Sequence, residues 1–130
     1  MIQFHLDPRS GVATYLQIVQ QVKEALRLGV LDVGDQLPTV REVVAELAIN
    51  PNTVAKAYRD LEREGLVVAR QGRGTFVAST LAAPSLRHHD ELRARLERWL
   101  AAAEAAGLDE ESIRALVSTT LREARARRVA

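Results

Sequence analysis

The sequence predicts a mainly α-helical chain with one small β-hairpin, and three observations support this fold class. The 130 residues are enough for one ordinary domain, or for a small domain with an appendage. The apolar fraction of 47% and the charged fraction of 27% are typical of a soluble, packed protein. The composition changes near residue 80. Most of the β-branched residues and all but one of the seven glycines precede this point, whereas Leu, Ala, Arg and Glu dominate after it. We therefore expect a mixed unit with tight turns over residues 1–79 and a helical unit over residues 80–130.

The first elements are predicted from the spacing of apolar side chains. Residues 2–6 alternate apolar and polar side chains in the manner of a β-strand. A helix is expected over residues 12–28, because apolar side chains recur there at helical spacing, and Gly29 is a suitable C-terminal cap. A turn and a short extended piece follow over residues 34–37, since Pro38 disfavours helical geometry at the residue before it.

Two helices joined by a very short turn are expected next. Thr39 and Glu42 have the spacing of a capping box, which opens a first helix that ends near residue 48. We expect its buried face to consist of four aliphatic residues: Val40, Val43, Val44 and Leu47. Asn50 and Pro51 are an N-cap residue followed by proline at the first helical position, so a second helix starts there and stops at Gly65. Helices separated by so few residues must cross at a steep angle, which predicts a helix-turn-helix.

A β-hairpin is expected directly after the second of these helices. Residues 66–70 and 75–77 are rich in residues that favour strands, and glycines suited to a tight turn separate them. A helix-turn-helix followed by a hairpin is the winged variant of the motif. We refer to residues 1–79 as the winged unit and to the hairpin as the wing.

The second helix of the motif and the wing carry cations without neighbouring acids. No Asp or Glu lies between residues 48 and 59 or between residues 65 and 80. A helix that enters the DNA major groove needs hydrogen-bonding side chains near its N-terminus and phosphate-binding groups beside them. The N-terminal amides add an anion site, and an arginine at a wing tip is able to enter a minor groove. The pattern thus predicts a DNA-binding surface with these members: Asn52, Thr53, Lys56, Arg59, Arg70, Gly72, Arg73 and Gly74.

Three residues near this surface have simpler explanations that stay open. Pro51 starts a helix whatever its surroundings, and Thr53 is able to cap one. Tyr58 falls on the apolar face, so we expect its ring in the core and its hydroxyl at the rim rather than in contact with a base.

The stretch from Tyr15 to Val77 resembles the DNA-binding domain of the GntR family of bacterial transcription regulators. The matching segments are YLQIVQQVKEALRLGVLDVGDQLPTVRE, LAINPNTVAKAYRDLEREGLV and RQGRGTFV. The resemblance implies that Arg41 reads or flanks an operator. It implies the same of the start of the second helix and of the wing motif: Asn50, Pro51, Asn52, Thr53, Gln71, Gly72, Arg73 and Gly74. Many members have serine at the position of Thr39, and many have a base-contacting arginine at that of Pro51, so their operator sequence should not be transferred.

Two further helices are expected in residues 80–130. The first extends from Pro84 to about residue 106, Gly107 ends it, and acidic residues from Asp109 onward open the second. Two helices cannot enclose their own apolar stripes, so they must pack on the winged unit, on another copy of the chain, or on both. We expect a dimer interface, with the only tryptophan as its anchor, made by Leu92, Leu96, Trp99, Leu100, Ile113, Leu116, Val117 and Leu121.

This short C-terminal part is similar to that of the YtrA-type GntR subfamily. The likeness implies a homodimer, and a repressor often linked to transporter operons. A dimer on a two-fold axis would recognise a pseudo-palindrome whose half-sites lie about 10 bp apart, or a multiple of that spacing. The larger ligand-binding domains of other subfamilies have no room here, and whether a small-molecule effector exists remains open.

The function expected from these features is sequence-specific regulation of transcription. We expect a cytoplasmic, homodimeric bacterial protein that binds double-stranded DNA, more a repressor than an activator. The alternative is a winged-helix protein-interaction module without specific DNA binding. An enzyme is not expected, because the chain has no cysteine, no phosphate-binding loop and no nucleophile motif. Of the histidines (His5, His88 and His89), the adjacent pair would point about 100° apart on a helix, so we expect no metal and no cofactor. No apolar run approaches the length of about 18 residues that a membrane span needs.

Overall fold

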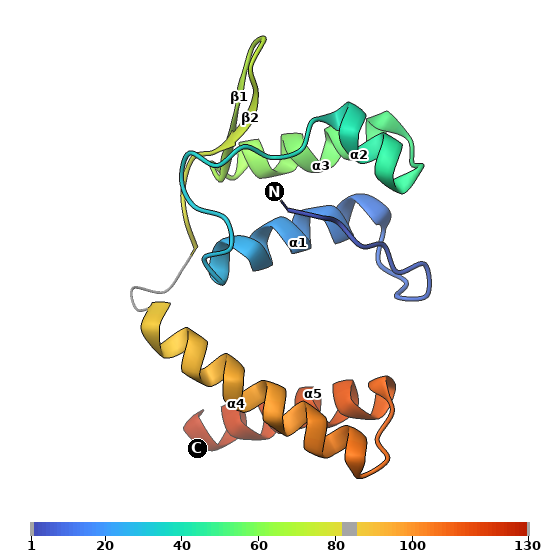
Figure 1. Ribbon diagram of the computed structural model, residues 1–130, viewed down its shortest axis with the longest axis vertical. Coiled ribbons are helices and arrows are strands. Elements are labelled where there is room, and N and C mark those ends of the chain that lie inside the picture. The colour runs from blue at the N-terminus through green and yellow to red at the C-terminus, as the bar shows by residue number, and fades with distance from the viewer. Residues whose placement is uncertain (1, 82–85, 130) are drawn as a thin grey trace. The chain divides into compact units, whose positions relative to one another are not determined.

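Five helices and one β-hairpin make up the described part of the computed structural model, which comprises residues 2–81 and 86–129 (Figure 1). Their order is α1, α2, α3, β1, β2, α4, α5. The expectation of a mainly helical chain with a small hairpin is confirmed. The chain divides into two units, one formed by Met1–Leu86 and the other by Arg87–Ala130. No helix within the described ranges is both long and apolar enough to span a membrane.

Helix α1, Thr14–Arg27, provides one wall of the core of the winged unit. Three of its aliphatic side chains, Ile18, Val22 and Leu26, are fully buried, and the helix packs against α3. Burial of an aliphatic side chain of this size contributes about 1.5–3 kcal/mol to stability. The helix ends as expected, because Gly29 takes the left-handed conformation with a φ of 70°.

Residues 2–6 form no strand, so the predicted β-strand is not present. Burial alternates as expected, with the Phe4 side chain in the core. The backbone N–H of His5, however, donates to Oε1 of Gln21 in α1, and the Gln21 amide donates to the carbonyl oxygen of His5. Because a side chain of α1 satisfies both backbone groups, the segment lies against the helix without a partner strand.

Helix α2, Val40–Leu47, opens with the predicted capping box. The Thr39 hydroxyl accepts the Glu42 N–H at 3.1 Å, and the Glu42 carboxylate accepts the Thr39 N–H at 3.3 Å. Only Val43 is fully buried, so the expectation of a buried four-residue face was too broad. The other three members of that face are half-buried at the edge of the core: Val40, Val44 and Leu47.

Helix α3, Pro51–Arg63, completes the helix-turn-helix. The Asn50 side chain accepts the Asn52 N–H at 2.8 Å, which confirms the predicted N-cap. Past the end of the helix, Gly65 takes a φ of 76°, so α3 ends where the sequence predicts. All four residues of the expected apolar face are buried: Val54, Ala57, Tyr58 and Leu61.

The wing consists of strands β1, Val67–Arg70, and β2, Gly74–Val77, in antiparallel register. Val67 pairs with Val77 and faces the core, whereas Val68 pairs with Phe76 on the opposite face. The extended piece that precedes α2 lies along β2, with an isolated bridge between Gln36 and Phe76. This third segment attaches the hairpin to the rest of the winged unit.

The second unit is a pair of helices, α4, Leu86–Ala105, and α5, Glu110–Val129. Gly107, with a φ of 92°, separates them as predicted. Oδ1 of Asp109 accepts the Ser112 N–H at 2.8 Å and caps α5, and hydrogen bonds from Ser112 lower the pKa of this carboxyl. The predicted start of the first helix at Pro84 lies outside the described residues.

Candidate nucleic-acid interface

The exposed face of α3 carries the predicted DNA-contacting residues. Asn52, Lys56 and Arg59 are exposed, and Thr53 is half-buried. Because the opposite face of the helix is in the core, these side chains lie on its outer face. The acids of α3 begin only at Asp60, in its second half, so the first half carries the positive charge of Lys56 and no carboxylate.

The N-terminus of α3 is formed by Asn50 and Pro51. The Asn50 carboxamide oxygen is used by the cap, which holds the first turn in place, and Pro51 is exposed at the first helical position. Within the described residues, the Asn52 side chain makes no hydrogen bond, so its donor and acceptor face solvent. This geometry suits recognition of a base edge, because a carboxamide offers both a donor and an acceptor.

Lys56 lies over an aromatic ring that comes from another helix. Its Nζ is 3.9 Å from the centroid of the Tyr15 ring, which belongs to α1. The apolar spacing of α1 includes Tyr15, but sequence analysis missed its place beside the cationic face of α3. Helical spacing identified its side of α1 but not its neighbour on α3.

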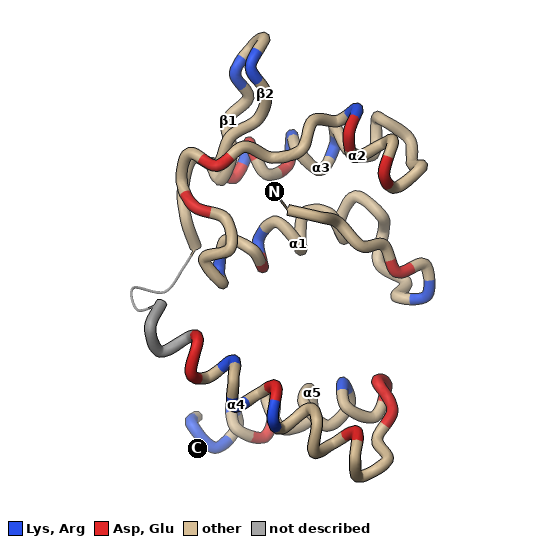
Figure 2. The backbone as a smooth tube through the Cα atoms, viewed as in Figure 1, with Lys and Arg blue, Asp and Glu red and all other residues tan. Residues whose placement is uncertain are grey.

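The wing presents two exposed arginines, Arg70 and Arg73. Figure 2 shows a basic segment on each arm of the hairpin near its tip, with no acidic residue there. The Arg73 N–H donates to the Arg70 carbonyl at 2.9 Å and closes the turn, which also contains Gln71 and Gly72. The Arg70 guanidinium lies 5.8 Å from the Phe76 ring centroid, on the face opposite the core.

The side chain of Gln36 holds the tip of the wing. Its Nε2 donates to the Arg73 carbonyl oxygen at 3.2 Å. A Cβ at Gly74 would lie 2.6 Å from this nitrogen, and Gly74 has a φ of 122°, so a side chain there would strain the backbone and displace the Gln36 amide. Sequence analysis found the glycine but missed Gln36, because nothing in the local pattern links residues that far apart.

Arg41 is exposed in the first turn of α2, beside the capping box. The structure therefore positions the predicted polar residues on three elements of one unit, α2, α3 and the wing. Tyr58 of α3 holds the segment that leads into α2, because its hydroxyl donates to the Pro38 carbonyl oxygen at 2.6 Å. This hydroxyl is buried, not at the rim as expected, and burial together with the nearby Glu42 carboxylate raises the pKa of Tyr58.

Comparison with known proteins relates this geometry to a family. Residues 14–77, from α1 to the end of the wing, match the family described as "Bacterial regulatory proteins, gntR family". The solved structure of YtrA from Sulfolobus acidocaldarius, described as a GntR-family transcription factor, is 36% identical, with a TM-score of 0.54 over 75% of this chain and 97% of that one. This chain belongs to the GntR family.

Two other similar proteins bear on the interface. The transcriptional repressor YtrA of Bacillus subtilis is 50% identical over 78 residues, which are 60% of this chain and 58% of that protein, so the match spans less than two thirds of the relative. The DNA-binding domain of AraR in complex with the operator ORR3 is 28% identical, with a TM-score of 0.50 over 59% of this chain and 93% of that one. Relatives named as regulators agree with the expectation that the chain is not an enzyme.

The helices α4 and α5 lie beyond the stretch that matches the GntR family. Most of their large apolar side chains are exposed to solvent, with Trp99 38% exposed and Leu121 66% exposed. Of the expected interface, Leu100 and Ile113 are half-buried and the remaining members are exposed: Leu92, Leu96, Trp99, Leu116, Val117 and Leu121. None of the described residues of α5 is buried.

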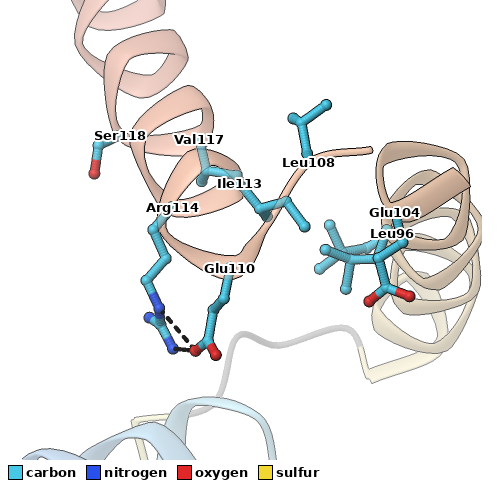
Figure 3. Close-up of a pocket in the computed structure, with 9 residues that line it drawn as sticks. Leu96, Glu104, Leu108, Glu110, Ile113, Arg114, Val117 and Ser118 are labelled. Atoms are coloured by element: carbon cyan, nitrogen blue, oxygen red, sulfur yellow. Dashed lines mark hydrogen bonds and ion pairs between the residues drawn. The ribbon is translucent and has the colours of Figure 1, made fainter. Parts of the chain in front are cut away.

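Among the described residues, two of the hollows lie between these helices. The larger, of about 830 Å³, is lined mainly by apolar residues of both helices, and Figure 3 shows Leu96, Leu108 and Ile113 around it. The ion pair between Glu110 and Arg114, at 2.8 Å, lies at its edge. The smaller hollow, of about 390 Å³, includes Trp99. Side chains of α4 and α5 alone therefore leave the apolar stripes of this unit uncovered.

Proposed function

We propose that this chain is a sequence-specific, DNA-binding regulator of transcription that inserts α3 into the major groove. The observation that carries the proposal is the exposed, acid-free first half of α3 beside a basic wing. Both lie within the stretch that matches the GntR family. A relative of the same fold crystallised with its operator supports DNA as the partner.

The residues of this surface divide into two roles under the proposal. Asn52, at the start of α3, reads a base edge, with the N-terminal turn formed by Asn50 and Pro51 approaching the same groove. The cations contact the backbone instead, because a compact ammonium or an exposed guanidinium binds phosphate oxygens regardless of sequence. These backbone contacts come from Lys56, Arg59, Arg41 and Arg70, while Arg73 at the wing tip enters a minor groove.

We further propose that two copies associate through α4 and α5. Exposed apolar residues on both helices favour this assembly, because burying a side chain such as Leu or Trp against a second copy removes its apolar surface from water. A symmetric dimer presents two copies of α3, and these recognise a pseudo-palindromic operator with half-sites about 10 bp apart or a multiple of that distance. Bound over a promoter, such a dimer acts as a repressor. The resemblance to YtrA-type members suggests a transporter operon and the regulator's own gene as targets.

A gel-shift titration against the DNA upstream of the chain's own gene tests the proposal. We expect binding at least about 10³-fold tighter to one site there than to random duplex of equal length, at physiological salt. The logarithm of affinity should fall linearly with the logarithm of salt concentration, since phosphate contacts release counterions. Equal affinity for both duplexes at every salt concentration would contradict specific recognition, and a protein partner would then become the better explanation of the winged unit.

A further inference from the structure

The contact between Lys56 and Tyr15 joins the exposed face of α3 to the first turn of α1. Lys56 is exposed, Tyr15 is half-buried, and the 3.9 Å between Nζ and the ring centroid is well within the range of a cation–π interaction. The two helices pack against each other, and the Tyr15 side chain adjoins the hydrophobic core. The ring is therefore a fixed support for a side chain that otherwise has many conformations.

We propose that Tyr15 is a positioning residue for DNA binding, which acts by holding the Lys56 ammonium on the exposed face of α3. The inference rests on the proposed binding of DNA. A free lysine loses much side-chain entropy when its ammonium binds one phosphate. The ring removes part of that loss before DNA arrives, because it restricts the ammonium to one region while the N–H groups that point away from the ring stay available.

The partner of Lys56 is an aromatic ring rather than a carboxylate, and this supports the proposed role. Within the described residues it forms no ion pair with a carboxylate, whereas Lys23 of α1 pairs with Glu64 at 2.8 Å. A carboxylate would restrain an ammonium equally well, but it would also neutralise the charge and compete with phosphate. An aromatic ring restrains the ammonium and leaves its full charge for the anion.

The test compares four variants with wild type in binding to a random-sequence duplex at low salt, because phosphate contacts do not depend on sequence. Tyr15→Leu should weaken binding about 2- to 10-fold, the loss of affinity expected when one flexible side chain must be ordered on binding, with the salt slope unchanged. Lys56→Met should weaken binding and also flatten the salt slope by about one unit. The double variant should bind no more weakly than Lys56→Met alone, and Tyr15→Phe should bind like wild type because it keeps a ring.

Lys23→Met is the matched control, since it removes a lysine that joins α1 to the C-cap residue of α3, outside the proposed surface. It should leave DNA affinity unchanged. Equal losses for Tyr15→Phe and Tyr15→Leu would assign the effect to the hydroxyl and overturn the inference. Additive losses in the double variant would also overturn it. If wild type binds no duplex at all, the proposed function itself fails, whereas a Tyr15→Leu protein that binds like wild type contradicts only the role of Tyr15.

A structural readout keeps the inference falsifiable if Tyr15→Leu does not fold. In the NMR spectrum of the wild-type protein, the ε-methylene protons of Lys56 should be shifted upfield by the ring. The shift should persist in Tyr15→Phe and in the DNA complex. Unshifted protons in wild type, or a shift that disappears when DNA binds, would contradict the proposal.

Discussion

At the scale of single residues, Tyr58 occupies an apolar position of α3 and also makes a buried hydrogen bond. Its ring is in the core, and its hydroxyl is bonded to the carbonyl of Pro38, 20 residues earlier. The spacing of apolar residues in α3 correctly predicted that the ring is buried. The partner of the hydroxyl depends on how the segment before α2 crosses α3, which no local pattern contains.

Tyr58→Phe should lower the free energy of unfolding by about 1–3 kcal/mol, because the buried Pro38 carbonyl would lose its donor. The effect should depend on pH. The raised pKa keeps the folded phenol protonated, whereas in the unfolded chain it ionises near pH 10, its ordinary value. Tyr58 therefore stabilises the fold fully below about pH 10, and this contribution falls as the pH rises further. Urea unfolding of both proteins between pH 8 and 11 should show the difference shrinking, and a constant difference would be inconsistent with this account.

Substitutions on the exposed face of α3 should separate base reading from phosphate binding. Asn52→Ala should cost about 1–3 kcal/mol of affinity for the operator and relax specificity at one position, since a paired base edge loses its partner. Arg59→Ala should weaken binding to operator and random DNA alike, and flatten the salt slope by about one unit. Gel-shift titrations on both duplexes measure these effects. Equal losses on the two duplexes for Asn52→Ala would rule out a base-reading role.

At the scale of elements, the turn between α2 and α3 contains a strained residue. Ala48 has a φ of 55°, and it is the non-glycine residue with a positive φ among those described. An alanine in this conformation costs about 1–2 kcal/mol, because its Cβ approaches the neighbouring carbonyl. The N-caps of α2 and α3 were predictable from the sequence. The left-handed turn at Ala48 was not, since glycine or asparagine is its usual signal.

Ala48→Gly should raise the free energy of unfolding by about 0.5–1 kcal/mol, after the greater entropy of an unfolded glycine is subtracted. Ala45→Gly is the matched control, because Ala45 is exposed within α2, where the same substitution should destabilise the fold by about 1 kcal/mol. Thermal melting followed by circular dichroism measures both. Destabilisation by both substitutions would show that Ala48 is not strained in solution.

At the scale of the whole molecule, the described structure consists of two units with different kinds of surface. The winged unit encloses a core of buried side chains, but in α4 and α5 only Ala103 is buried among the described residues. Two helices form too thin a layer to cover both of their apolar stripes. The proposed dimer follows from this deficit.

Trp99→Ala should shift the chain from dimer to monomer, because a large aromatic anchor would be lost from the interface. Sedimentation equilibrium over a range of concentrations measures the change, and melting of the winged unit should be unaffected. Arg98→Ala is the control, since it changes an exposed charged neighbour on the same helix. A wild-type protein that sediments as a monomer at all concentrations would contradict the proposed dimer.

The sequence by itself determined the ends of the elements and the composition of the surface. Capping residues, glycines with positive φ and helical spacing act over a few residues, so Thr39, Asn50 and Gly65 marked their boundaries correctly. The exposed cations of α3 and the wing were predictable for the same reason. They occupy the positions outside the apolar pattern, and these positions lie on the outer face.

Only the tertiary structure decided which remote side chains support these elements. The amide of Gln21 replaces a strand beside residues 2–6, Gln36 holds the wing tip, and the ring of Tyr15 lies under Lys56. Each contact joins residues far apart in the chain. Such contacts depend on how helices and strands pack in three dimensions. The local periodicity of a sequence carries no information about which remote residues this packing brings together.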